Sequence, residues 1–360
     1  MLVFDRSKIN GINHLVWNNG KIYFTDEAPN NCFIYGSDCC RSINNMAKLF
    51  LKEIPEIIPE NFSTMVNTLG IQNPNWVSIM GKEKFMDCIK KVISSYEHLR
   101  QGLEMSTVRQ QLKIECLMRM MNPVKYDVSK IDQSLLPRFN TKLKPYLKDG
   151  LLQQPYYIRT KTKTGRLTVQ HGPSVLTMHA GLRKGLVDAI QIDFRSCEPN
   201  LLLAYQGREV YPDLYSTLAE EVFNGKLSRA KVKLSIIASL YNSERRNKNA
   251  QAIAEFFQVD KIVEELESSV NNGVLKNMYN RPILVEETRK NHLLSLWLQS
   301  SAVDAALTGF CNLVSSNKLV KPYWIIHDAL IINNVDINVD HLDVGNNFML
   351  PIKIGSFDEE

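Results

Sequence analysis

Residues 190–203 have the sequence IQIDFRSCEPNLLL, and this stretch decides the fold class. Its apolar first half, within the run that begins at Val187, predicts a buried strand that ends near Asp193. A second apolar run, Tyr323–Ile326, leads in the same way to Asp328. Each aspartate is therefore expected at the end of a strand that the core holds rigidly.

The segments around these two strands favour helices. Apolar spacing predicts helical structure at 105–121, 213–268 and 288–315, and less clearly near 42–53 and 82–100. The order of strands and helices lacks the regular alternation of a doubly wound sheet. We therefore predict an α+β fold with an antiparallel sheet and a helical insertion.

Two aspartates on neighbouring strands predict a metal site. If the strands that precede Asp193 and Asp328 are neighbours, the two carboxylates can bind two Mg²⁺ ions together with substrate phosphates. Two such ions stabilise the attacking and leaving oxygens of an in-line phosphoryl displacement. The alternative is that each aspartate is an ordinary turn residue at a strand end, which is the usual role of a lone aspartate there.

The charge distribution indicates a polyanion as partner. The chain has 43 Lys and Arg against 38 Asp and Glu, a net charge of only +5. However, residues 142–184 contain nine Lys or Arg and one acid, and residues 226–248 contain seven and one. Two basic stretches on an otherwise acidic chain favour a side that faces a polyanion. Two solvated basic faces are the alternative.

The second basic stretch contains SRAKVKLSIIASLYN, residues 228–242. Arg229, Lys233, Ile237 and Tyr241 are spaced by four, so they form one stripe of a helix. The stripe offers two cations for a triphosphate, then an apolar contact and a ring for the sugar and base. A surface helix with two cations and a half-buried tyrosine is the alternative.

The first basic stretch contains TKTGRL, residues 162–167. Arg166 follows a flexible glycine and can bind a phosphate or a base edge bidentately. A polar turn is the alternative.

Cysteine content and hydropathy indicate a reducing compartment and no membrane partner. The chain has seven cysteines, an odd number, and with 360 residues it is long enough to form a core without disulfides. Both facts argue against a disulfide framework. The first residues lack the apolar core of a signal peptide. The most apolar run, 293–314, contains Gln299 and Asp304, so it is typical of a buried helix. We expect a cytoplasmic protein, in a bacterial cell or in an infected host, associated with the nucleoid.

Six segments together resemble the polymerase domain of family A DNA polymerases, the bacterial DNA polymerase I type. The resemblance covers about residues 155–354, and the segments follow the family's order. In order, they are TKTGRL at 162–167, IQIDFRSCEPNLLL (motif A), DLYSTLAEEVF at 213–223, SRAKVKLSIIASLYN (motif B), LQSSAVDAAL at 298–307 and IIHDAL at 325–330 (motif C).

The resemblance implies a right-hand polymerase fold with an antiparallel palm sheet, helical fingers and a reduced helical thumb. It implies palm at 151–212 and 291–360 and fingers at 213–290. Outside the resemblance, short β-like runs such as HLVW and KIYF predict a small β-rich region of unknown role at 1–45. The helical segments of 46–150 are assigned to the thumb-like region by their position in the chain. The short N-terminal part lacks the Asp-x-Glu pair and the length of a proofreading exonuclease, so we expect none.

The resemblance also implies residue roles. Asp193 and Asp328 hold two Mg²⁺ ions, for which Mn²⁺ can substitute, and Lys233 acts as a general acid toward pyrophosphate. The residues implied to bind the nucleotide are Arg229, Lys233, Ile237, Tyr241, Glu198 and Tyr215, with Glu198 as a steric gate against a 2′-hydroxyl. The residues implied to contact DNA are Thr164, Arg166, Gln299 and His327.

The sequence departs from the family pattern at five positions. Motif B has Ile237 and Asn242 where an aromatic residue and a glycine are usual. Tyr215 replaces a histidine that binds phosphate, Ala329 follows Asp328 in place of a glutamate, and Asn291 stands near an expected arginine.

The implied function is template-directed DNA synthesis, in which dNTPs are added to the 3′ end of a primer on a template. The implied role is DNA replication or repair, as in a compact viral-type polymerase, and the implied partners include other replisome subunits. A non-catalytic DNA-binding or scaffolding subunit of a replisome is one alternative. An RNA-synthesising relative is the other, although Glu198 argues against it.

Overall fold

The structure is a computed structural model of the 360-residue chain. It describes residues 14–18, 21–25, 60–71, 76–81, 83–84, 87, 105–159, 162–241, 247–285 and 290–357. The chain divides into two compact units, residues 1–116 and 117–360. The finer domain boundaries expected from the sequence stay predictions.

The described part of the first unit combines one hairpin with helices. Strands β1 (His14–Asn18) and β2 (Lys21–Thr25) pair in antiparallel fashion, as the β-like runs of this region predict. The helices are α2 (Glu60–Thr68), α3 (Trp76–Met80) and the start of α5 (Met105–Arg119). Helix α5 confirms the one predicted near 105–121. The helix predicted near 42–53 lies outside the described residues, as does most of the one near 82–100.

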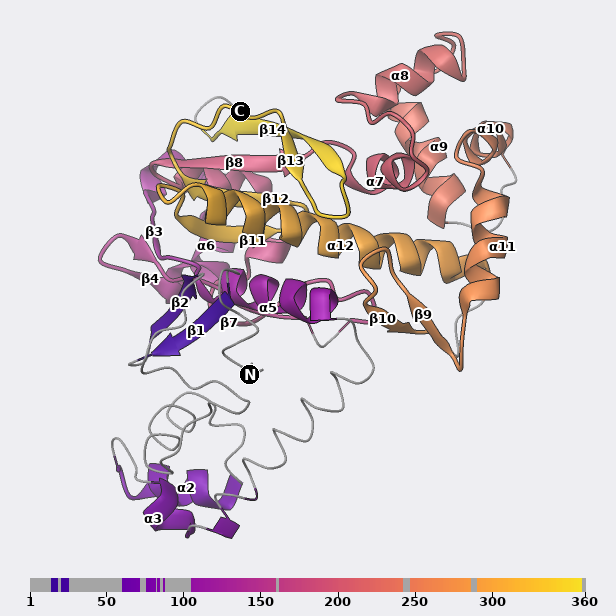
Figure 1. The fold of residues 1–360 in the computed structure, drawn as a ribbon. Helices are drawn as coiled ribbons and strands as arrows, with labels where there is room; N and C mark the ends of the chain where they lie inside the picture. The colour runs from indigo at the N-terminus through magenta and orange to yellow at the C-terminus, as the bar shows by residue number, and fades with distance from the viewer. Residues whose placement is uncertain are drawn as a thin grey trace. The chain divides into compact units, whose positions relative to one another are not determined.

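The second unit is built on a five-stranded antiparallel sheet with the order β11-β12-β8-β14-β13 (Figure 1). Its strands are β8 (Ala189–Phe194), β11 (Pro322–Ile326), β12 (Ala329–Asn333), β13 (His341–Asp343) and β14 (Met349–Ser356). Strand β8 is central and pairs with β12 on one side and β14 on the other. The predicted α+β class with an antiparallel sheet is therefore confirmed for this unit.

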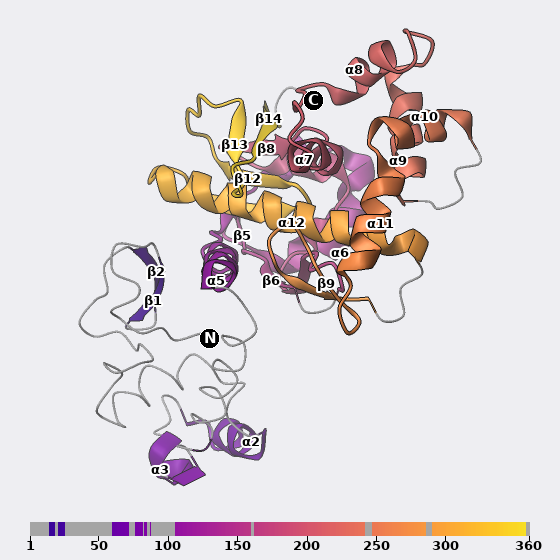
Figure 2. The same ribbon diagram turned by 45° about the vertical axis from the view of Figure 1, so that its right-hand side comes forward.

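Alternation along β8 gives the sheet two different faces. Ile192 and Phe194 are buried, at 0% and 3% exposure, and point to one face. On that face the Phe194 ring packs against Phe310 of α12 (Lys290–Ser316), with centroids 5.4 Å apart. Both ribbon views show α12 running along the sheet (Figures 1 and 2). Gln191 and Asp193 point to the opposite face.

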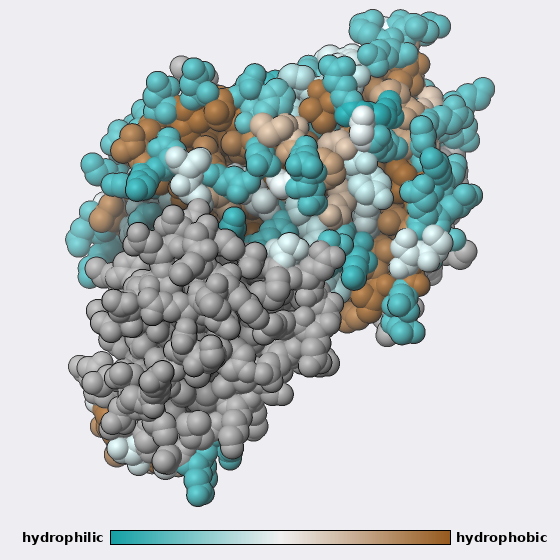
Figure 3. Space-filling view, viewed as in Figure 1, coloured by the Kyte–Doolittle hydropathy of each residue, from teal (hydrophilic) through white to brown (hydrophobic). Residues whose placement is uncertain are grey.

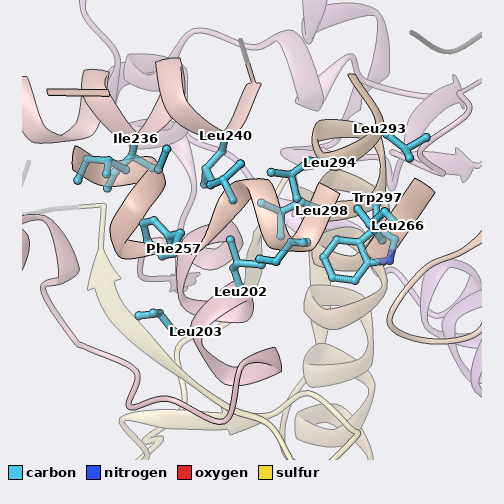
Figure 4. Close-up of a cluster of buried hydrophobic side chains, with 14 of the residues drawn as sticks. Leu202, Leu203, Ile236, Leu240, Phe257, Leu266, Leu293, Leu294, Trp297 and Leu298 are labelled. Atoms are coloured by element: carbon cyan, nitrogen blue, oxygen red, sulfur yellow. The ribbon is translucent and has the colours of Figure 1, made fainter. Parts of the chain in front are cut away.

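A helical group adjoins the sheet. Its members are α7 (Cys197–Tyr205), α8 (Leu214–Glu221), α9 (Arg229–Tyr241), α10 (Lys248–Phe256) and α11 (Val259–Ser269), with the first half of α12. These helices share one apolar cluster, in which Leu202, Ile236, Phe257 and Trp297 are almost fully buried (Figure 4). The hairpin of β9 (Val274–Lys276) and β10 (Pro282–Leu284) also contributes Leu275 and Ile283 to the cluster.

Residues 120–159 contain more strand than the predicted helical region 46–150 implies. The elements are β3 (Val124–Lys125), α6 (Leu136–Lys142), β4 (Leu147–Lys148), β5 (Leu151–Leu152) and β6 (Tyr156–Ile158), which pairs with β7 (Thr168–His171). Short 3-10 turns start at Asp127 and Asp132, whose carboxylates accept hydrogen bonds from the backbone N–H groups of Ser129 and Ser134. The remaining difference comes from pairing, because β3 and β4 both pair with β5, and β6 pairs with β7.

Hydrophilic side chains cover much of the described surface on the face shown in Figure 3, with apolar residues between them. Within the described ranges, no helix has both the length and the apolar character that a membrane crossing requires.

The contact between α12 and β8 leaves no room at Gly309. A Cβ there would lie 2.8 Å from the Phe194 ring and 3.1 Å from the Val344 side chain, whereas a Cβ at Gly355 of β14 would meet nothing within 4 Å. We predict that Gly309→Ala lowers the free energy of unfolding by about 1–3 kcal/mol, despite the better helix propensity of alanine. Gly355→Ala is the matched control and should change it by less than about 0.5 kcal/mol. Urea denaturation measures both, and equal effects would contradict the packing described here.

Candidate active site

Asp328 lies in a two-residue turn that closes the hairpin of β11 and β12. The last paired residues are Ile326 and Ala329, so His327 and Asp328 form the turn. His327 has a φ of +56°, in the left-handed region that histidine visits more readily than bulky apolar residues do. The turn therefore places Asp328 at the end of the hairpin.

Strand pairing brings the second aspartate to the same place. Ala329 is the cross-strand partner of Asp193, and the backbone N–H of Phe194 donates to the carbonyl of Asp328 at 3.2 Å. Two residues 135 positions apart in the sequence thus become neighbours. The sequence predicted this proximity on the condition that the strands preceding the two aspartates are neighbours. That condition is not met, because β12 lies between β11 and β8. The proximity arises instead from the β11–β12 turn, which places Asp328 directly before the strand that pairs with β8.

Burial disfavours the charged form of both carboxylates. Burial is the main cause that raises the pKa of Asp193 to about 6, and the nearby Asp328 charge raises it further. Arg183, Lys353 and a hydrogen bond from Gln191 act in the opposite direction. Burial also raises the pKa of Asp328, against the charges of His327, Arg166 and Lys233. A site of this kind favours a bound cation, because a cation removes the repulsion.

A cleft of about 1020 Å³ opens beside the two aspartates. Most residues that the sequence assigned to catalysis or binding line it together. They are Asp193, Asp328, Lys233, Arg229, Ile237, Glu198, Tyr215, Arg166 and His327. Thr164, Gln299 and Tyr241 are not among the described residues that line the cleft.

Helix α9 forms one wall of the cleft. Its inner face, with Val232 and Ile236, is buried in the helical group, so Lys233 and Ile237 face outward on the cleft side. Tyr241 follows the same four-residue spacing, but four residues advance a helix by slightly more than one turn. The stripe has therefore rotated at Tyr241, which packs against the apolar cluster with its phenolic oxygen buried.

Arg229 is held by two side chains from the start of α8. Its Nε atom lies 3.1 Å from Oδ1 of Asp213, and its guanidinium lies 5.0 Å from the centroid of the Tyr215 ring. Asp213 also caps α8, because its carboxylate accepts a hydrogen bond from the backbone N–H of Ser216 at 3.4 Å, and it accepts a second one from the Ser216 hydroxyl at 2.7 Å. Although burial opposes the shift, these hydrogen bonds lower the pKa of Asp213. Asp213 is a site residue that the sequence analysis did not single out.

Glu198 occupies the first turn of α7, directly after β8. It pairs with Arg166 at 3.2 Å, which joins the 162–167 loop to the cleft. Burial raises the pKa of Glu198, while the Arg166 charge lowers it in part. The pair therefore brings together two residues, 32 positions apart, that the sequence assigned to different ligands.

A buried ionic network fixes the loop that carries Arg166. Asp304 of α12 is fully buried and pairs with Arg159 and, at 2.6 Å, with Nε of Arg281. Arg281 also donates to the carbonyl of Thr164 at 2.7 Å, and Arg159 donates to the carbonyl of Gly165 at 3.0 Å. Thr164 therefore contributes its backbone to this network, and its side chain is buried.

Gly165 is required by the same network. Its φ is +73°, and a Cβ at this position would lie 2.9 Å from Nη2 of Arg281. Gln299, the other predicted DNA contact on α12, is half-buried outside the cleft lining. Asn242 lies outside the described residues.

The structure adds one cation that the motifs do not contain. Lys353 of β14 lines the cleft and is the cross-strand partner of Asp193. No sequence spacing indicates it, because only the register of β14 against β8 brings it to the site.

The carboxylate oxygens of the site suit a hard divalent cation that takes its remaining ligands from substrate phosphates. Among the described residues, no group of three or more His, Cys, Asp and Glu side chains converges on one point. Two carboxylates, Asp193 and Asp328, line the same cleft, and Mg²⁺ is commonly bound by one or two carboxylates plus substrate phosphates.

No family model matches the chain, and no curated protein matches its sequence. One solved structure to which the chain is similar is the POL domain of Pol1 from M. smegmatis, in complex with DNA primer-template and dNTP. The sequence identity is 13% and the TM-score is 0.43, over 82% of this chain and 55% of that chain. The chain thus spans about half the length of that neighbour.

The raised pKa of Asp193 predicts how the metal-free protein responds to pH. The unfolded carboxyl ionises near its usual value of 3.8 and the folded one near 6, so stability falls as the pH rises through this range. Above pH 6 the whole penalty is present, on the order of 2 kcal/mol. We predict that Asp193→Asn is more stable than wild type at pH 8 in EDTA, and that the difference shrinks at pH 4.

Thermal unfolding at the two pH values measures this effect. Asp336→Asn, an exposed residue outside the cleft, is the control and should change stability equally at both. A pH-independent effect of Asp193→Asn would show that folding does not raise the pKa of Asp193.

Proposed function

We propose that the chain is a template-directed DNA polymerase that adds dNTPs to a primer 3′ end and releases pyrophosphate. One observation carries the proposal: the register of β12 against β8 brings Asp193 near Asp328 in a cleft that Arg229 and Lys233 also line. The six ordered segments that resemble family A polymerases support the same reaction. In this proposal the sheet is the palm and the α8–α11 group is the fingers.

Asp193 and Asp328 would hold two Mg²⁺ ions, with Mn²⁺ as a substitute. When bound, these ions stabilise the attacking and leaving oxygens of the phosphoryl transfer. The bond that forms joins the primer 3′ oxygen to the α-phosphorus, and the bond that breaks joins this phosphorus to the oxygen of the pyrophosphate group. The proton of the 3′-hydroxyl passes to solvent.

The cations of α9 bind and orient the triphosphate. The charge of Lys233 lowers the pKa of Asp328, so the two side chains interact through the cleft. A phosphate group bound between them would be close to both. The ammonium group of Lys233 is a proton donor for the departing pyrophosphate. Arg229 is presented toward the cleft by Asp213 and Tyr215, so its guanidinium is oriented before the nucleotide arrives.

Glu198 selects the sugar in this proposal. Its side chain lines the cleft beside the two aspartates and is fixed by Arg166. A fixed carboxylate next to the sugar excludes a 2′-hydroxyl by volume and by desolvation. Arg166 and His327 contact the primer–template end in this proposal, and other replisome subunits act together with the chain.

A second candidate function is DNA binding without catalysis, as a scaffolding subunit. The observation that favours it is the pairing of two cleft arginines with carboxylates of the chain itself, Arg229 with Asp213 and Arg166 with Glu198. A measurement of incorporation separates the two functions.

We predict that the full chain extends a primed template with dNTPs in Mg²⁺ or Mn²⁺, and that Asp328→Asn reduces extension to background while DNA affinity changes little. The reason is that the variant loses a metal ligand but no cation of the cleft. Primer extension on gels and fluorescence anisotropy of the same duplex measure the two properties. Asp336→Asn is the control and should extend primers as wild type does. Tight DNA binding without incorporation by wild type, with either metal, would favour the scaffolding function.

Sugar selection gives a separate prediction for Glu198. Glu198→Ala opens space beside the nucleotide sugar, so the preference for dNTPs over NTPs should fall by on the order of tenfold or more. Single-nucleotide incorporation with matched dNTP and NTP measures the ratio. Glu255→Ala on the exposed side of α10 should leave it unchanged. A wild-type ratio near unity would instead indicate an RNA-synthesising enzyme.

A further inference from the structure

Lys353 stands on the side of Asp193 that faces away from Asp328. It is the cross-strand partner of Asp193 on β14, whereas Ala329 is the partner on β12. Directly opposed residues of an antiparallel pair point to the same face, with Cβ atoms about 4.5–5.5 Å apart. Lys353 therefore projects from the face that carries Asp193, and it lines the cleft as an exposed residue.

The charge of Lys353 affects the ionisation of Asp193. Its ammonium group lowers the pKa of Asp193, as does the guanidinium of Arg183. The two cations are placed differently. Arg183 is half-buried and donates to Oε1 of Gln191, a side chain on the same face of β8 as Asp193, at 3.2 Å. Lys353 is the one of the two that lines the cleft.

The cleft thus has cations from two different elements near the aspartate pair. Arg229 and Lys233 come from α9, and Lys353 comes from the sheet. In order across the sheet edge, the turn holds Asp328, β8 holds Asp193 and β14 holds Lys353. A polyphosphate bound at the two carboxylates would therefore lie next to Lys353 as well as in the cleft that the α9 cations line.

We propose that Lys353 binds a phosphate group of the substrate beside Asp193. The inference rests on the proposed function for the identity of the substrate, but the contact is defined by charge and geometry alone. The phosphate comes from one of two sources, the triphosphate of the incoming nucleotide or the backbone of the DNA. A lysine suits either source, since its ammonium group binds phosphate as a compact point charge without a fixed orientation.

Two binding experiments without turnover test the inference and separate the sources. The first titrates the full chain with inorganic tripolyphosphate in EDTA at low ionic strength. Lys353→Ala should weaken binding by about fivefold to tenfold, and Lys353→Arg should restore most of it. Lys231→Ala is the matched control, because Lys231 is exposed on α9 but does not line the cleft, and it should bind as wild type does.

The second experiment measures the affinity of a primer–template duplex in EDTA as a function of salt. If Lys353 contacts the DNA backbone, Lys353→Ala should reduce the slope of log K against log salt by about one. If it contacts the nucleotide, the slope should stay at the wild-type value and only tripolyphosphate binding should weaken. If Lys353→Ala shows the wild-type affinity for tripolyphosphate and the wild-type salt slope for DNA, the inference is overturned.

A structural role of Lys353, as a counter-charge for Asp193 only, is tested by combining Lys353→Ala with Asp193→Asn. A direct contact with phosphate predicts that the loss of binding persists in the Asp193→Asn background. Loss of binding that disappears there would also overturn the inference. Because neither experiment depends on nucleotide incorporation, both outcomes are informative even if the wild-type chain extends no primer, a result that would contradict the proposed function alone.

Discussion

The antiparallel pairing of β8 with β12 and β14 is the constraint on which the rest of the site depends. Backbone hydrogen bonds fix which residues face each other, and a slip of one position would turn Asp193 to the opposite face of the sheet. With the observed register, Ala329 and Lys353 flank Asp193. The apolar half of β8 keeps that register, because Ile192 and Phe194 must pack on the α12 side.

The site also depends on buried charge that is compensated. Asp304 lies at 0% exposure, where a lone carboxylate would be strongly disfavoured, and it persists because Arg159 and Arg281 surround it. The same arginines bind the carbonyls of Thr164 and Gly165. Removal of one partner would leave an uncompensated charge in the core, so the loop and α12 keep a fixed relation.

The cleft itself contrasts with that network. Asp193 and Asp328 are close to each other, and burial together with like charge raises the pKa of Asp193. A raised pKa of this kind means that the ionised carboxylate lowers the stability of the folded protein. Such a cost in stability is typical of functional sites, where residues are arranged for a ligand. The surrounding cations, among them Lys233 and Lys353, reduce the cost without forming a closed ion pair in the way that Arg166 does with Glu198.

The sequence by itself determined the strands that end at Asp193 and near Asp328, the helix with Arg229 and Lys233, and the α+β class, because periodicity and strand ends are local properties. Most of the site residues that the family resemblance implied also line the cleft. Only the tertiary structure decided that Tyr241 packs against the helical core and that the carbonyl of Thr164 accepts a hydrogen bond from Arg281. Both contacts depend on residues far away along the chain. Lys353 belongs to the same group, because β-sheet register is set by pairing between distant strands and leaves no trace in local spacing.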